Sequence, residues 1–134
     1  MIKVKWMVTC LCLLWVTFVQ ADMKPIPIYM EDQLGITVTQ DQSRFQIKLK
    51  SSAGTGFSWF LRSIDNTMIV PEKRVMMPST TKLTGAVGYE LWTFRVKPGA
   101  FIVPQQTLIR FIYSRPWDIN EQGKMVVARV STVM

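Results

Sequence analysis

The sequence contains no histidine, and its two cysteines both lie within residues 1–21. Without histidine, Ser-His-Asp catalysis, Cys-His catalysis and histidine-based metal sites are excluded. From residue 22 onward there is no thiol and no disulfide, so packing and hydrogen bonds alone must stabilise the fold. The acidic residues are spread singly, except for Glu31-Asp32, which has no matching ligand cluster. We therefore expect no enzyme activity, no metal and no cofactor, and a small hydrolase is the weakest of the alternatives.

The sequence also has no sustained helical period and no block of like charge. Its formal net charge is +7, from 16 basic and 9 acidic residues. The basic residues are scattered and alternate with apolar ones, which is typical of solvated strand faces. Because they form no basic stripe, the pattern argues against a nucleic-acid partner. An acidic partner or an anionic surface remains open as an alternative.

The longest apolar run, Trp6–Val19, lies at the N-terminus and follows Lys3 and Lys5. It is shorter than the about 20 residues that a membrane span needs. Residues 19–21 then supply small side chains at the two key positions of a cleavage site. This pattern predicts that residues 1–21 are a signal peptide cleaved after Ala21, with an uncleaved anchor as the alternative. We expect an exported protein, periplasmic or secreted, with no stable membrane association after cleavage.

The rest of the chain predicts one domain of short strands. Residues 22–33 hold two prolines and read as an extended lead-in, and the domain is expected over residues 34–134. The clearest alternation runs over Arg44–Lys50, where Phe45, Ile47 and Leu49 are expected to face inward. Other strands are expected at Leu34–Thr39, Phe57–Ser63, Met68–Met77, Tyr89–Lys97, Ala100–Val103, Thr107–Tyr113 and Lys124–Val133. Short strands separated by turn residues favour an all-β fold, an antiparallel β-sandwich.

Two of these strands carry more specific expectations. Pro71 interrupts Met68–Met77, which favours an edge position because proline cannot donate a ladder hydrogen bond. In Tyr89–Lys97 the alternation predicts that Trp92, Phe94 and Val96 point into the core.

Three loops carry the residues that favour binding. The first has Gly54-Thr55-Gly56 at its tip, where glycine permits a positive φ and a close approach to another surface. Phe57 and Trp59 follow, two residues apart, which places both rings on one face of a strand. We expect these rings to pack in the core and hold the loop in shape.

The second loop is Gly85-Ala86-Val87-Gly88, and the third is Arg115-Pro116-Trp117 after Tyr113. Proline stiffens the third loop, so Trp117 can be presented with little ordering cost on binding. Tryptophan and arginine are also the residue types most enriched at interface hot spots. Each loop alone has an ordinary interpretation, as a hairpin turn, a flexible turn or a cover over the edge of the core. The order and spacing of all three carry the information.

Together these loops resemble those of the chagasin-type inhibitors of papain-like cysteine peptidases. That family carries Asn-Pro-Thr-Thr-Gly-Phe-x-Trp, then Gly-x-Gly-Gly, then Arg-Pro-Trp. Here Thr55-Gly56-Phe57 with Trp59 matches the end of the first motif, and Arg115-Pro116-Trp117 matches the third completely. Gly85 and Gly88 match the outer glycines of the second motif.

The chain departs from the family pattern at three points. Ser52-Ala53 replaces Asn-Pro, Gly54 stands where threonine is frequent, and Val87 replaces a glycine. The first two changes remove a stiffening proline and loosen the tip of the first loop, and the third adds a side chain to the second loop. Each is expected to weaken binding or to change which peptidase is preferred.

The resemblance implies an immunoglobulin-like sandwich with three binding loops at one end and a papain-like cysteine peptidase as partner. The first loop would enter the active-site cleft, with Thr55 and Gly56 near the catalytic cysteine of the target. The other two loops would clamp the rims, with Trp117 against an aromatic surface and Arg115 hydrogen bonding. Inhibition would be reversible and non-covalent. Separately from the resemblance, nothing in the sequence indicates more than a monomer. The implied peptidase-binding residues are Gly54, Thr55, Gly56, Gly85, Ala86, Val87, Gly88, Arg115, Pro116 and Trp117, and the implied loop-support residues are Phe57, Trp59 and Tyr113.

The alternative function is an exported immunoglobulin-like binding or adhesion module without inhibitory activity. Such a module would use a sheet edge rather than loop tips. It should therefore tolerate substitutions in the loops, whereas an inhibitor should lose activity.

Overall fold

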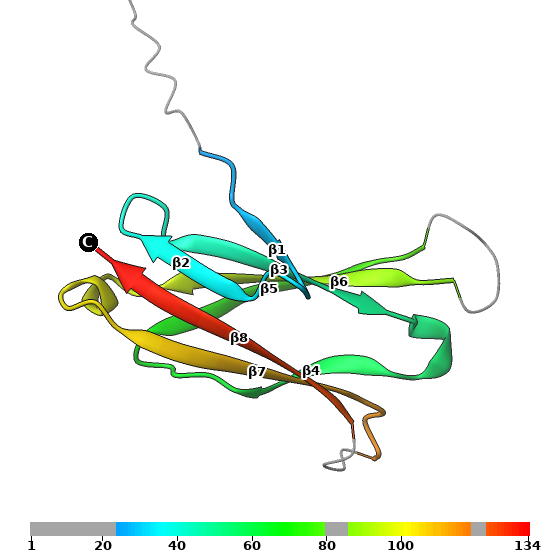
Figure 1. The fold of residues 1–134 in the computed structure, drawn as a ribbon. Helices are drawn as coiled ribbons and strands as arrows, with labels where there is room; N and C mark the ends of the chain where they lie inside the picture. The colour runs from blue at the N-terminus through cyan, green and yellow to red at the C-terminus, as the bar shows by residue number, and fades with distance from the viewer. Residues whose placement is uncertain (1–23, 80–85, 119–122) are drawn as a thin grey trace, which may run out of the picture.

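The computed structural model describes residues 24–79, 86–118 and 123–134. Over these residues the chain forms two packed four-stranded sheets, one ordered β1-β3-β6-β5 and the other β2-β8-β7-β4 (Figure 1). The predicted all-β sandwich is confirmed. The strands are β1 Ile28–Met30, β2 Gly35–Thr39, β3 Arg44–Ser51, β4 Ser58–Ser63, β5 Ile69–Met77, β6 Gly88–Val96, β7 Gln106–Ser114 and β8 Lys124–Val133.

The predicted signal peptide, residues 1–21, lies outside the described residues. Among the residues that are described, no helix has the length and apolar character to cross a membrane.

The core lies between the two sheets and follows the period-two patterns of their strands. Phe45, Ile47 and Leu49 of β3 are fully buried, as their alternation with charged and polar residues predicts. On the neighbouring strand β6, Phe94 and Val96 also face the core. The second sheet contributes inward residues from β2, β4, β7 and β8, including Ile36, Val38, Trp59, Ile109, Phe111, Ala128 and Val130.

The edge strands show how pairing departs from the sequence pattern. Strand β5 lies at the edge of its sheet, as Pro71 predicts, and its register with β6 shifts between Pro71 and Lys73. Strands β1 and β2 each pair in parallel, with β3 and β8 respectively, so the sandwich is not wholly antiparallel. Because β1 pairs with β3, part of the expected lead-in joins the first sheet.

The prediction of a strand at Ala100–Val103 is wrong. A 3₁₀ helix, η2, occupies Pro98–Phe101 instead, with proline in its first turn. Ala100 and Phe101 are buried while Ile102 and Val103 are exposed, a pairwise pattern that fits a turn and not a strand. The φ of proline is fixed at a value suited to the first turn of a helix, which explains why this apolar segment forms a 3₁₀ helix and not a strand.

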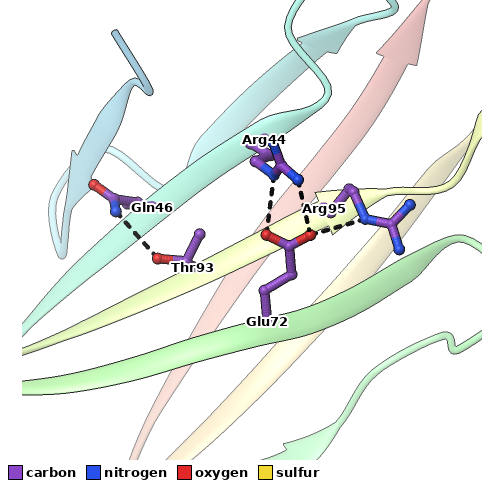
Figure 2. A network of polar contacts seen from close by, with 5 residues as sticks. All are labelled: Arg44, Gln46, Glu72, Thr93 and Arg95. Carbon is purple, nitrogen blue, oxygen red and sulfur yellow. Dashed lines mark hydrogen bonds and ion pairs between the residues drawn. The ribbon is translucent and has the colours of Figure 1, made fainter.

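The outer face of the first sheet carries a polar network that joins three strands (Figure 2). The carboxylate of Glu72 on β5 accepts hydrogen bonds from Arg44 Nε on β3 at 3.0 Å and from Arg95 Nε on β6 at 2.8 Å. Gln46 Nε2 donates to Thr93 Oγ1 at 3.1 Å on the same face. Burial alone would raise the pKa of Glu72, but the hydrogen bonds and charges of the two arginines lower it below its usual value.

Candidate functional site

All three loops lie at one end of the sandwich. They connect β3 to β4, β5 to β6 and β7 to β8, and the strand registers bring their ends together: Ser51 pairs with Gly88, and Ser58 pairs with Ser114. In Figure 1 the strand ends that flank these loops lie at the end of the sandwich away from the C-terminus. We call the described loop residues, 52–57, 78–79, 86–87 and 115–118, the loop edge.

The first loop is closed by its own hydrogen bonds. Residues Ala53–Thr55 form a 3₁₀ turn, η1, in which Thr55 Oγ1 donates to the Ser52 carbonyl at 2.6 Å. Gly56 then adopts a φ of +79°, a conformation that residues with a Cβ rarely adopt. The positive φ that glycine permits, which was expected for the whole tip, therefore occurs at Gly56 and not at Gly54. Gly54, Thr55 and Gly56 are all exposed.

A row of aromatic rings runs from the core to this loop. The Trp59 ring is fully buried, and its centre lies 4.9 Å from the centre of the Tyr113 ring. The centre of the Tyr113 ring lies in turn 5.4 Å from the centre of the Phe57 ring. Tyr113 also accepts a hydrogen bond through its hydroxyl from the Ser52 N–H at 2.9 Å. Trp59 Nε1 donates to the Lys50 carbonyl at 2.8 Å. The rings therefore connect both ends of the first loop to β3 and β7.

Glu90 also fixes the first loop, and the sequence reasoning missed it. Its side chain is fully buried and accepts a hydrogen bond from the Trp59 N–H at 2.9 Å, directly after the loop. Arg74 Nε on β5 donates to the same carboxylate at 2.7 Å, which compensates its buried charge. The signal was present, because Glu90 alternates with Trp92 and Phe94 on the inward side of β6. An acidic residue at an inward position predicts a buried partner.

The third loop lies against the first. The Arg115 guanidinium lies over the Phe57 ring, 4.7 Å from its centre, a cation–π contact between the two loops. A Cβ placed on Gly56 would lie 3.4 Å from Trp117 Cη2, so the indole ring passes close beside the tip of the first loop. Even so, Trp117 is 76% exposed, the largest exposed ring among the described residues. The Asp118 N–H donates to the Arg115 carbonyl at 3.1 Å and closes the turn around Pro116.

The second loop is described only in part. Gly85 lies outside the described residues, while Ala86 is partly buried and Val87 is half exposed. Gly88 is the first residue of β6 and is buried, so it borders the loop edge and does not project from it. A Cβ at Gly88 would lie 2.6 Å from the Met77 carbonyl oxygen. This glycine therefore permits the close approach of β5 to β6 beneath the loop.

The exposed groups of the loop edge fit recognition of another molecule. Its exposed groups include glycine backbone, the Thr55 hydroxyl and the side chains of Val87, Arg115, Trp117 and Asp118. Within the described part of the chain, no group of three or more acidic, histidine or cysteine side chains is placed to hold a metal ion. A large exposed ring beside a tight glycine turn is suited to contact with another protein.

Known proteins resemble this chain in sequence and in fold. A family model described as "Chagasin family peptidase inhibitor I42" matches residues 38–129, a range that includes all three loops. The crystal structure of the cysteine protease inhibitor EhICP2 from Entamoeba histolytica is similar, with a TM-score of 0.60 and 14% identity over 81% of this chain and 99% of that one. The solution structure of amebosin has a TM-score of 0.62 and 19% identity over 83% of this chain and all of that one. At these identities the structures show a shared fold, and no curated protein matches the sequence.

Proposed function

Because this chain belongs to the chagasin family of peptidase inhibitors, we propose that it inhibits papain-like cysteine peptidases reversibly by placing its loop edge in their active-site cleft. The observation that carries the proposal is the pairing of Trp117, which is 76% exposed, with the exposed tip of the first loop at Gly56. A narrow glycine turn and a large indole ring are therefore exposed side by side. The protein itself is proposed to act by binding, not as an enzyme.

The internal bonds of the first loop support this mechanism. A flexible loop would lose conformational entropy on binding, which weakens affinity. Here the hydrogen bonds of Ser52 with Thr55 and Tyr113 order the loop before it binds. They also offset the loss of the stiffening proline at the position of Ala53. The tip would reach the catalytic cysteine of the target as a 3₁₀ turn, not as an extended strand. We expect a turn of this shape to block the cleft without being cleaved.

The second and third loops would contact the rims of the cleft. Arg115 is held over Phe57 and would hydrogen bond at the rim while Trp117 covers an apolar surface. Ala86 and Val87 would contact the opposite rim. Family membership favours this function over an adhesion module that binds through a sheet edge. We further propose that the protein is exported through residues 1–21 and acts as a monomer.

The test is a titration of the purified protein against papain and a cathepsin L-type peptidase, each followed with a small fluorogenic substrate. We expect saturable inhibition that is reversed on dilution. Replacing Trp117 by alanine should raise the inhibition constant at least about tenfold, as loss of an interface hot spot does. No inhibition by the folded protein at micromolar concentration, against either peptidase, would contradict the proposal.

A further inference from the structure

A pocket of about 150 Å³ lies between the first and second loops. Its lining includes Gly54 from the first loop, Ala86 from the second, and Ser51 and Met76 from the strands beneath them. We call it the loop pocket. It opens among residues of the loop edge but contains strand residues that the three family motifs do not include.

The loop pocket is the unfilled end of the sandwich interior. Ser51 pairs with Gly88 and Met76 pairs with Glu90, and residues directly opposite each other share a face of the sheet. Glu90 faces inward, so Met76 also lies on the inner face of β5. Among the described residues, the lining at this end of the core combines the small residues Ser51, Ala86 and Gly88 with Met77, Pro78 and Tyr89, and a pocket of about 150 Å³ is left between them.

Two features of the lining are unusual for the core of a folded protein. Met76 lies on an inward face yet is 45% exposed. The Ser51 hydroxyl is buried and has no hydrogen-bond partner among the described residues. An inward methionine that stays 45% exposed marks apolar surface that a partner's apolar side chain can cover. The Ser51 hydroxyl would stay unpaired beside such a side chain, so it does not bear on the nature of the guest.

We propose that the loop pocket receives one apolar side chain, of about the size of an aromatic ring, from the rim of the target peptidase. A cavity of about 150 Å³ is large enough to hold benzene, which sets the size of the guest. The guest would complete the core against Met76, in the manner of an interface anchor that fills a pocket. This inference rests on the proposed function and adds a pocket on the inhibitor to the contacts made by the loop tips.

The test compares substitutions that change the loop pocket with a matched control. Met76→Glu places a charge in the pocket, and Ser51→Val narrows it while replacing the unpaired hydroxyl by an apolar group. Val127 is the control position, because it is 42% exposed and lies on the outer face of β8, away from the pocket. Inhibition constants would be measured for papain and a cathepsin L-type peptidase, with thermal unfolding of each variant alongside.

We expect Met76→Glu and Ser51→Val to raise the inhibition constant at least about tenfold, and Val127→Glu to change it less than about twofold. Ser51→Val should unfold at the same or a higher temperature, so it decides the question even if Met76→Glu fails to fold. If the wild-type protein inhibits, Trp117→Ala weakens it and the pocket variants behave like Val127→Glu, then the pocket inference is wrong and the proposed function stands. If the folded wild-type protein inhibits neither peptidase, the proposed function fails and the pocket inference falls with it.

Discussion

Trp59, in strand β4 after the first loop, and Trp117, in the third loop, lie in opposite environments. Trp59 is fully buried, packs on Tyr113 and donates its indole hydrogen bond to the Lys50 carbonyl. Trp117 is 76% exposed and has the tip of the first loop, at Gly56, beside it. The buried ring therefore supports the loops, and the exposed ring is available to a partner.

This difference predicts opposite effects of the same substitution. Trp59→Ala should lower the free energy of unfolding by about 3–5 kcal/mol, the cost of removing a large ring from a packed core. Trp117→Ala should change it by no more than about 0.5 kcal/mol, because little of that ring is covered. Denaturation in urea, followed by circular dichroism, measures both. A large loss of stability in Trp117→Ala would show that the ring supports the fold and would remove it from the binding surface.

At the scale of the elements, the first loop is fixed by groups from three different strands. Lys50 belongs to β3, Glu90 to β6 and Tyr113 to β7, and each bonds to the loop or to Trp59 directly after it. The sequence motif predicted Tyr113 as support, since it precedes the third loop in a family pattern. The motif did not include Glu90. The alternation of β6 does place Glu90 on the inward side, but its partners Trp59 and Arg74 lie on other strands, and no local pattern specifies such long-range contacts.

Strand β6 begins at a glycine for a reason that can be tested. A Cβ at Gly88 would lie 2.6 Å from the Met77 carbonyl oxygen, so Gly88→Ala must push β5 away from β6. We expect a loss of about 1–3 kcal/mol in the free energy of unfolding, as for other overpacked sites. Gly35 is the matched control, because it also begins a strand and an added Cβ there meets nothing within 4 Å.

Gly35→Ala should leave stability unchanged or raise it by up to about 1 kcal/mol, through a less flexible unfolded chain. Thermal and urea denaturation of both variants would give the comparison. Equal stability of Gly88→Ala and wild type would mean that β5 is not held close to β6 beneath the second loop.

At the scale of the whole molecule, alternation predicted most of the sandwich, including β8 at Lys124–Val133 with both bounds as observed. It failed at Ala100–Val103, where a short apolar run has no period and Pro98-Gly99 favours a turn. Alternation also did not predict that β1 pairs in parallel with β3 and β2 in parallel with β8, because a strand's partner depends on the path of the whole chain. The loop pocket was missed for the same reason, since it forms where Ser51, Gly54 and Ala86 meet from separate segments.

The stability of the whole fold should depend on pH through Glu72. The pKa of Glu72 is raised by burial but lowered more by the hydrogen bonds and charges of Arg44 and Arg95, so the net shift is below the usual value of 4.5. A carboxylate with a lowered pKa stabilises the fold above the pKa of the unfolded chain, and this contribution is lost as the pH falls through the pKa of the folded protein. The free energy of unfolding should therefore be level near neutral pH and fall below about pH 4.5.

Glu72→Gln tests this contribution directly. At pH 7 the variant should be less stable than wild type by about 1 kcal/mol or less, because both ion pairs are near the surface. The difference should shrink toward zero as the pH is lowered, since the wild-type carboxylate is then protonated. Some acid dependence should remain in the variant, because Asp65 also has a lowered pKa, chiefly through the side-chain hydrogen bond from Thr67. Urea denaturation at a series of pH values measures the difference, and a constant gap from pH 7 to pH 3 would show that Glu72 stabilises the sheet by packing and not by charge.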